Sequence, residues 1–272
     1  MLAILATHPI QYQIPIWRQL ADGGRVSFEV WYLTAHGVRA SHDKEFGQSF
    51  MWDFPLLDGY PYRFVPDPVP DELGGFWDVG LGADFRARLQ SGEINALLVA
   101  GWNVRACWEA VFLAHFLGIQ VWMRGESNDL KVDRGIKRIG KRWLLNLFFN
   151  RVDRFLCIGA ANRRLYQSYS VCEERLLSGP YCVDNGRFAD LASSFRPQRM
   201  ALRRAWGIPD GAYCLLYAAK FIPKKRPLDL IVAVRRLMES DQTRTYHILF
   251  VGAGLLGDDM RRLCQVMYDA AG

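Results

Sequence analysis

The sequence, 272 residues long, lacks long apolar segments. Its apolar runs, such as Leu144–Phe149 with Asn146 inside it, fall far short of the roughly 18 residues that a membrane-spanning helix needs. The amino terminus has no basic segment and reaches His8 too early for a signal peptide. We therefore expect a protein without a spanning helix or a cleaved leader, located in the cytoplasm.

Metal and redox motifs are missing as well. The six cysteines form no C-x-x-C pair, and the five histidines show no metal-ligand spacing. Reduced thiols are the usual state of such cysteines in a cytosolic protein. Hydrophobic residues make up 50% of the chain and charged residues only 23%, which excludes intrinsic disorder. We expect a globular protein that binds no metal and holds no cofactor.

The positive charge of the chain is concentrated in one segment. Residues 131–154 carry eight basic and two acidic residues, which accounts for the whole net charge of +6. A helix predicted at 134–149 places basic side chains on one arc and apolar side chains on the other. One interpretation is a surface helix whose apolar face packs in the core. The other is docking on anionic lipid, peripherally at the inner face of a membrane, through Lys137, Arg138, Lys141 and Arg142. Nucleic acid is not expected as a partner, because interleaved stacking aromatics are not evident.

Short apolar stretches alternate with stretches of helical spacing along the first two thirds of the chain. Leu2–Thr7 and Ala96–Ala100 are typical of buried strands, and Ala106–Leu117, followed by Gly118, is typical of a helix. Repeated strand–helix–strand order predicts an α/β fold with a doubly wound parallel sheet. We place this first Rossmann-like domain at residues 1–186.

A polar stretch at 184–197 is typical of a linker. Beyond it the alternation resumes, with strands predicted at 214–219 and 247–251. A complete α/β domain commonly needs about 100–200 residues. Residues 187–272 are therefore expected to be an incomplete second Rossmann-like domain.

Two loops of this second domain carry candidate binding residues. The loop at 218–227 follows a strand and contains four cations, among them Lys220 and Lys225, which suit phosphate; a solvated basic loop is the alternative. The segment Gly252–Gly257 fits G-x-G-x-x-G. It predicts either a backbone that approaches the phosphates of a nicotinamide cofactor or a plain strand–turn–helix junction.

In their order these segments resemble the retaining glycosyltransferases of family 4, which have the two-domain GT-B fold. The second domain of that family opens with a strand, then G-R-L-x-x-x-K-G and a helix. Lys220 falls on the arginine of that motif and Lys225 on its lysine. His247–Gly254 resembles the family's strand with G-x-G, and Cys157–Tyr169 resembles the end of its first domain. Ala6–Gln13 stands where the family has its first glycine-rich loop, without the glycines.

The resemblance implies transfer of a sugar from a nucleotide diphosphate sugar to a hydroxyl of a glycan or lipid-linked acceptor in polysaccharide biosynthesis, with retention. It implies that Lys220 and Lys225 bind the donor diphosphate, that Gly252 and Gly254 form the glycine loop, and that no metal is essential. The family's E-x7-E element, which carries carboxylates near the donor sugar, is absent from this sequence. The 272 residues alone are therefore expected to be inactive as a transferase.

Four polar residues follow predicted strands of the first sheet. His8 and Gln11 come after the first strand, and Arg124 and Glu126 come after the strand at 119–123. Arg124 could hold an anionic group by a bidentate contact. Glu126 could orient or deprotonate an acceptor hydroxyl, which makes it the candidate catalytic residue. A turn histidine and an internal pair of Arg124 with Glu126 are the alternatives.

Two other classes of function remain open. An NAD-dependent oxidoreductase would use Gly252–Gly257 for its cofactor. A non-catalytic protein would bind a membrane surface through the helix at 134–149.

Overall fold

The computed structural model describes residues 1–38, 41–43, 48–50, 52–129 and 136–268. The chain divides into two compact units, which are treated separately. The first comprises Met1–Arg39 and Met51–Val183, and the second comprises Ala40–Phe50 and Asp184–Gly272. The sequence places the boundary nearby, at residue 186, and does not anticipate the assignment of Ala40–Phe50.

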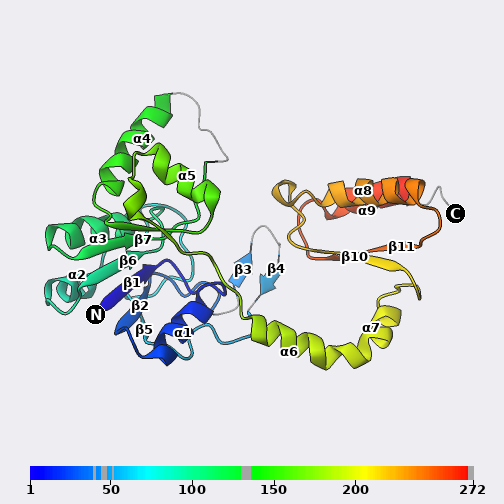
Figure 1. Ribbon diagram of the computed structural model, residues 1–272, viewed down its shortest axis with the longest axis horizontal. Coiled ribbons are helices and arrows are strands. Elements are labelled where there is room, and N and C mark those ends of the chain that lie inside the picture. The colour runs from blue at the N-terminus through cyan, green and yellow to red at the C-terminus, as the bar shows by residue number, and fades with distance from the viewer. Residues whose placement is uncertain (39–40, 44–47, 51, 130–135, 269–272) are drawn as a thin grey trace. The chain divides into compact units, whose positions relative to one another are not determined.

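Seven parallel strands form the sheet of the first unit, in the order β5-β2-β1-β6-β7-β8-β9 (Figure 1). From β1 the chain winds outward through β2 to β5, and from β6 it winds the other way to β9. The winding therefore reverses between the neighbours β1 and β6, where Leu5 pairs with Val99. The strands are β1 Leu2–Ala6, β2 Phe28–Tyr32, β5 Tyr62–Phe64, β6 Ala96–Val99, β7 Gln120–Met123, β8 Arg154–Cys157 and β9 Leu176–Ser178.

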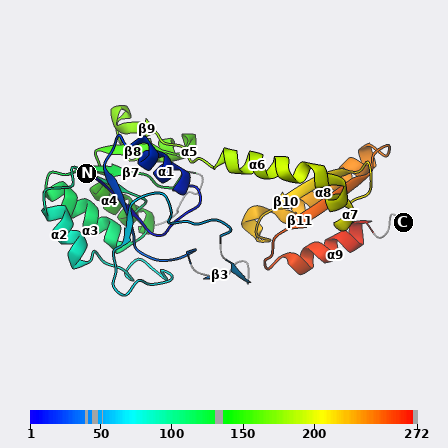
Figure 2. The same ribbon diagram turned by 90° about the horizontal axis from the view of Figure 1, so that it is seen from below.

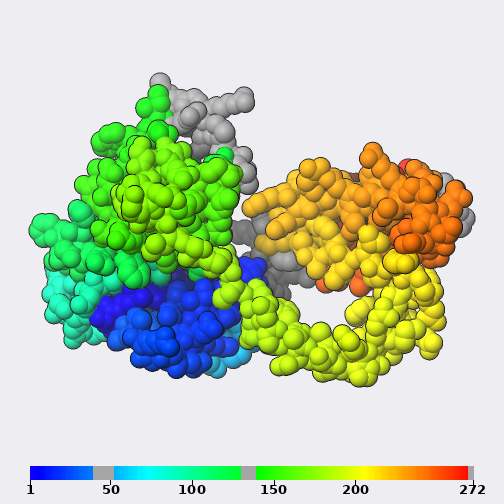
Figure 3. All heavy atoms as spheres, viewed as in Figure 1, coloured from blue at the N-terminus to red at the C-terminus, as the bar shows by residue number. Residues whose placement is uncertain are grey.

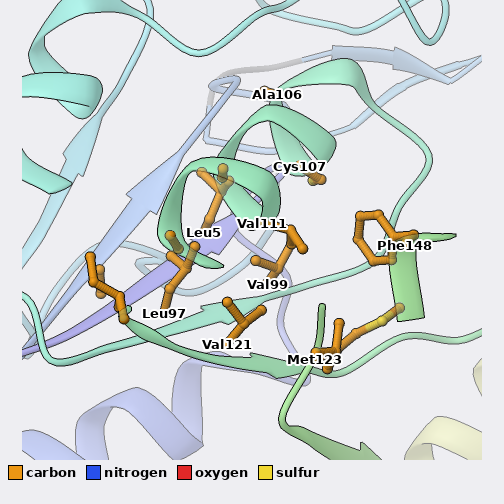
Figure 4. Packing of buried hydrophobic residues seen from close by; sticks show 14 of the residues in the cluster. Leu5, Leu97, Val99, Ala106, Cys107, Val111, Val121, Met123 and Phe148 are labelled. Carbon is orange, nitrogen blue, oxygen red and sulfur yellow. The ribbon is translucent and has the colours of Figure 1, made fainter. Parts of the chain in front are cut away.

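Alternation of side chains along the central strands gives this sheet two apolar faces. On one face Leu5 and Val99 pack with Phe148 and other residues of α2–α5 into the larger core cluster (Figure 4). On the other face Ile4 packs with Trp17 of α1. Figure 2 shows α1 on the opposite side of the strands from α2 and α3. The helices are α1 Ile14–Gly23, α2 Ala83–Gln90, α3 Arg105–Phe116, α4 Ile136–Phe149 and α5 Ala160–Ser168.

Local sequence explains where these helices begin and end. Helix α1 has Pro15 in its first turn, where a missing N–H leaves no helical hydrogen bond unmade. It is capped by Gly24, whose φ of 58° is left-handed. Gly118 follows α3 with a φ of 72°, as the sequence predicts.

The second unit contains a pair of parallel strands, β10 Tyr213–Ala218 and β11 Tyr246–Val251. The prediction of a linker at 184–197 is wrong, because most of that stretch is helix α6. The Asp184 carboxylate accepts a hydrogen bond from the Arg187 N–H and so caps the helix. Its apolar residues recur at helical spacing, a signal that the polar composition obscures. The other elements are a hairpin of β3 Ser41–Asp43 and β4 Gln48–Phe50, and the helices α6 Asn185–Phe195, α7 Arg199–Ala205, α8 Pro227–Ser240 and α9 Gly257–Tyr268.

None of the helices within the described ranges is both long enough and apolar enough to cross a bilayer.

The larger core cluster gives a test of the first unit. Phe148 is wholly buried, so Phe148→Ala is expected to lower the free energy of unfolding by about 3–5 kcal/mol, through lost transfer free energy and the cavity left behind. The matched control is Phe116→Ala in α3, where the side chain is 84% exposed and the change should stay within about 0.5 kcal/mol. Urea denaturation followed by circular dichroism measures both. If Phe148→Ala and Phe116→Ala lowered the free energy of unfolding equally, the assignment of Phe148 to the core would be contradicted.

Candidate functional site

A cavity of about 380 Å³ opens at the carboxyl edge of the first sheet, where the winding reverses between β1 and β6. Its wall comes mainly from the segments that follow β1, β6 and β7, and Gln13 and Tyr181 complete it. Gly101, with a φ of 104°, makes the turn after β6. Open α/β sheets bind ligands at such reversal points, in pockets of roughly 300–1,000 Å³. This cavity is therefore the candidate site of the first unit.

Three of the four residues that the sequence predicts here lie on the cavity wall. They are His8, Arg124 and Glu126. Gln11 does not line the cavity, and Gln13, two residues further, does. Residues 10–13 form a turn in which the Gln13 N–H donates to the Ile10 carbonyl, and this turn determines which glutamine faces inward.

Arg124 holds protein rather than presenting an open cation. Its side chain is 6% exposed, and its Nε and Nη2 donate to the carbonyls of Gly179 and Pro180 over 3.1 and 2.7 Å. The guanidinium also lies 4.3 Å from the centre of the Tyr181 ring. The bidentate contact expected with an anionic ligand thus goes to two backbone carbonyls instead. Arg124 fixes the segment that carries Tyr181.

Glu126 is the exposed carboxylate of the cavity. The Tyr181 hydroxyl donates to Glu126 Oε1 over 2.7 Å, and no described residue forms a hydrogen bond with Oε2. Burial and the neighbouring Glu126 carboxylate raise the pKa of Tyr181 above its ordinary value, so the hydroxyl stays a donor. The buried Asn162 holds the segment that carries Glu126, because its Nδ2 donates to the carbonyl of the next residue, Ser127, over 2.6 Å.

His8 is a neutral imidazole at physiological pH. Burial, followed by the nearby His36, lowers its pKa from 6.5 to about 4. Its Nδ1 lies 3.0 Å from the Thr7 hydroxyl, and its ring meets the His36 ring edge-on, with 5.1 Å between centroids. The histidine thus contributes a neutral hydrogen-bonding group to the wall.

In the second unit the predicted cations lie between β10 and α8. Lys220 is partly exposed and Lys225 is exposed, at either end of a loop that contains a short 3₁₀ turn. The Tyr217 hydroxyl ties the loop together, because it reaches the Lys225 carbonyl over 3.1 Å and the Lys220 carbonyl over 3.4 Å. The loop leads directly into the amino end of α8, whose dipole favours anions.

The glycine motif has a packing explanation. A Cβ on Gly252 would collide with the Ala219 carbonyl, and one on Gly254 would lie 2.7 Å from the Phe221 carbonyl. Backbone hydrogen bonds join the two loops, with Phe221 N–H donating to the Ala253 carbonyl over 2.8 Å. These glycines let the two loops meet, which favours the strand–turn–helix interpretation over a dinucleotide site.

Helix α4 packs into the core with only some of its apolar side chains. Leu145, Phe148 and Phe149 are buried, whereas Ile139 and Trp143 are 69% and 66% exposed. Figure 3 shows the green residues of α4 at the surface of the first unit. The side chains of the predicted cations Lys137 and Arg138 lie outside the described part. Lys141 and Arg142 are exposed, and Arg142 donates to the Ser168 carbonyl over 2.6 Å.

No group of three His, Cys, Asp or Glu side chains within the described ranges could hold a metal ion.

Sequence reasoning misses three residues of the site, Gln13, Tyr181 and Asn162. A signal exists for Gln13, because glutamine stands directly before a helix where Ser, Thr, Asp or Asn is usual. Tyr181 and Asn162 have no comparable local signal, since their partners lie 55 and 35 residues away in the chain.

The pKa of His8 predicts a pH dependence of stability. The unfolded chain protonates His8 near pH 6.5, whereas the folded protein resists this down to about pH 4, so acid favours unfolding across that window. From about pH 7 to pH 4.5, the free energy of unfolding should fall by up to about 2–3 kcal/mol more in the parent protein than in His8→Gln. Urea denaturation at both pH values measures it. His115→Gln, an exposed control, should behave like the parent; identical slopes for all three proteins would contradict the burial of His8.

No protein-family model matches the sequence, and no characterised protein matches it by sequence. Among solved structures the chain is similar to a UDP-forming α,α-trehalose-phosphate synthase from Burkholderia vietnamiensis, with a TM-score of 0.60 and 12% identity over 100% of this chain and 68% of that one. It is similar to Anabaena Alr3699/HepE in complex with UDP and glucose, with a TM-score of 0.57 and 11% identity over 98% and 66%. It is also similar to a UDP-GlcNAc 2-epimerase from Neisseria meningitidis bound to UDP-GlcNAc, with a TM-score of 0.54 and 13% identity over 99% and 69%.

The chain thus spans about two thirds of the length of these structures. At such identities the likeness shows the fold. The fold class predicted from the sequence is confirmed: the chain has the α/β, Rossmann-like fold of the GT-B type.

Proposed function

We propose that the protein is a glycosyltransferase that moves a sugar from a nucleoside diphosphate sugar to a hydroxyl of a glycan or lipid-linked acceptor, with retention, as in family 4. The observation that carries the proposal is the cavity at the winding reversal, whose wall includes the neutral His8 and the Glu126 carboxylate, with an Oε2 that no described residue hydrogen-bonds. The fold likeness to UDP-forming and UDP-bound proteins supports a nucleotide-sugar donor.

The donor would be held by the second unit. Lys220 and Lys225 flank a loop that Tyr217 ties together, and the amino end of α8 follows the loop. As the bond from the sugar to the diphosphate breaks, negative charge develops on the leaving group. Ammonium groups and a helix amino terminus stabilise such charge where water is excluded. Catalysis in this proposal is mainly electrostatic and needs no metal and no resident cofactor.

The acceptor would be held by the first unit. A hydroxyl that donates to Glu126 Oε2 is oriented by a carboxylate whose other oxygen is fixed by Tyr181. As the new bond to the sugar forms, the hydroxyl proton must leave, and Glu126 is the group in the cavity that could take it. His8, held neutral, completes the polar wall without adding charge.

A nucleoside diphosphate should bind to the 272-residue protein. We expect UDP, GDP or ADP to raise its melting temperature, and Lys225→Ala to weaken that binding at least tenfold, or about 1.4 kcal/mol, the lower range for a charge-assisted contact. Lys224→Ala, which removes an adjacent exposed lysine outside the motif, is the matched control. Lys220→Arg should retain binding. Calorimetric titration gives the affinities. If Lys225→Ala and Lys224→Ala lost equal affinity, the loop would be only a diffuse basic patch. If none of the three nucleotides bound, the proposed function would be rejected.

The exposed face of α4 supports a second component, peripheral binding to an anionic membrane surface at its cytoplasmic side. Ile139 and Trp143 are exposed one turn apart, and the cation Lys141 of the same helix is exposed as well. An amphipathic helix of this kind inserts apolar side chains between headgroups and is attracted by anionic lipid. Such docking would bring the acceptor cavity to a lipid-linked substrate.

Sedimentation with anionic phospholipid vesicles tests this component. We expect the parent protein to bind at low salt and to be released as salt rises, because surface charges are then screened. Trp143→Ser should reduce binding, and joint replacement of Lys137, Arg138 and Lys141 by Gln should abolish it. The matched control is Trp77→Ser, which removes another exposed tryptophan, 72% accessible, from outside the helix. If the parent protein did not bind the vesicles at low salt, α4 would be an ordinary surface helix without a role in membrane binding.

A further inference from the structure

One face of the first sheet is covered over only part of its width. Among the described helices of the first unit, α1 alone contributes side chains to the core cluster on that face. Ile4, Leu98 and Trp122 lie side by side there on β1, β6 and β7, because Leu98 pairs with both of the others. Beside α1 the sheet remains open as a trough of about 760 Å³, which these three residues line.

The trough has a mainly apolar lining. Leu156 of β8 extends its floor, and Ile16 and Leu20 of α1 contribute a wall. Its lining continues to Gly179 and Pro180, which follow β9 at the carboxyl edge of the sheet. Volumes of roughly 300–1,000 Å³ with apolar walls are typical of small-molecule sites.

Arg25 gives the end of the trough at the amino edge of the sheet a positive charge. It is exposed in the loop between α1 and β2, and no described residue forms a hydrogen bond or an ion pair with its guanidinium. The other charged side chain in the lining is Arg124, whose Nε and Nη2 are occupied by two backbone carbonyls. No Asp or Glu stands among the described residues that line the trough. An apolar floor thus leads to an unpaired cation.

We propose that the trough binds a long-chain fatty acid, with the hydrocarbon chain along Ile4, Leu98 and Trp122 and the carboxylate at Arg25. Every methylene that leaves water for the apolar floor contributes to binding, and the head remains at the exposed end, where it needs no desolvation. Of the described lining residues, Arg124 alone is shared with the cavity at the winding reversal. The proposal therefore stands independently of the proposed sugar transfer.

A second copy of the chain fits the trough less well. A two-fold contact uses the same patch on both subunits, so it would bring the Arg25 side chains of both copies into one interface. No carboxylate of the described lining is there to pair with them. An anionic amphiphile supplies both the apolar surface and the missing negative charge.

Calorimetric titration of the 272-residue protein with octanoate, decanoate and dodecanoate, each below its micelle concentration, tests the proposal. We expect binding that tightens at least about fivefold for each pair of added methylenes, because each buried methylene adds transfer free energy. Decyltrimethylammonium, a cation with the same chain as decanoate, should bind at least about threefold more weakly. No binding of the alkanoates, an affinity independent of chain length, or equal affinity for the cation would overturn the proposal.

One substitution tests the position of the head. Arg25→Gln should weaken decanoate about threefold at low salt, as expected for an exposed ion pair, and should leave the neutral 1-decanol unchanged. The matched control is Arg236→Gln, which removes an exposed arginine of α8. Equal losses of decanoate affinity in the two variants would contradict a carboxylate bound at Arg25.

A second substitution tests the position of the chain. Ile16→Trp fills the trough from α1, so it should weaken decanoate and 1-decanol at least about tenfold, whereas Ile16→Leu, which conserves volume, should stay within about twofold. Ile16 is partly exposed, and Leu20→Trp repeats the test if Ile16→Trp does not fold. Unchanged binding in a folded tryptophan variant would place the chain elsewhere. Sedimentation velocity completes the test, because a dimer that Ile16→Trp dissociates would make the trough an interface between copies and overturn the proposal.

Discussion

Because all seven strands of the first unit run parallel, every strand leaves the sheet at the same edge. Residues that are far apart in the sequence therefore lie together at this edge, although nothing in the sequence near each of them indicates it. His8, Gly101 and Glu126 each follow a different strand. The reversal of winding between β1 and β6 sends the flanking connections to opposite faces, and the cavity lies at the edge where they part. The topology of the sheet therefore determines where the cavity lies, and the side chains determine its lining.

The side chains then determine what the cavity can accept. A buried guanidinium is costly unless hydrogen bonds compensate for lost water. Arg124 donates hydrogen bonds to two carbonyls, and its guanidinium also lies over the face of the Tyr181 ring. These contacts hold Tyr181 where its hydroxyl donates to Glu126. Arg124 thus fixes the tyrosine that positions the carboxylate of the cavity.

The sequence predicts the regular elements well because hydrophobic periodicity is a local property. It misses α6, where polar residues mask a helical repeat. For the helix at 134–149 it leaves open whether the apolar face packs in the core or docks on lipid, because periodicity identifies an apolar face without showing what covers it. In the site, the predicted residues His8, Arg124 and Glu126 line the cavity, whereas the sequence does not indicate their partners. Those partners depend on contacts such as Arg124 with Gly179, which only the folded sheet creates.

The segment that Arg124 holds is also the last stretch of the first unit. Gly179 and Pro180 are bound by the guanidinium, Tyr181 is bound by Glu126, and Cys182 and Val183 then lead to the boundary with the second unit. Thermodynamic linkage acts in both directions along such a connection. A ligand that strengthens the contact between Tyr181 and Glu126 would therefore also hold residues 179–183, the stretch with which the first unit ends, more firmly.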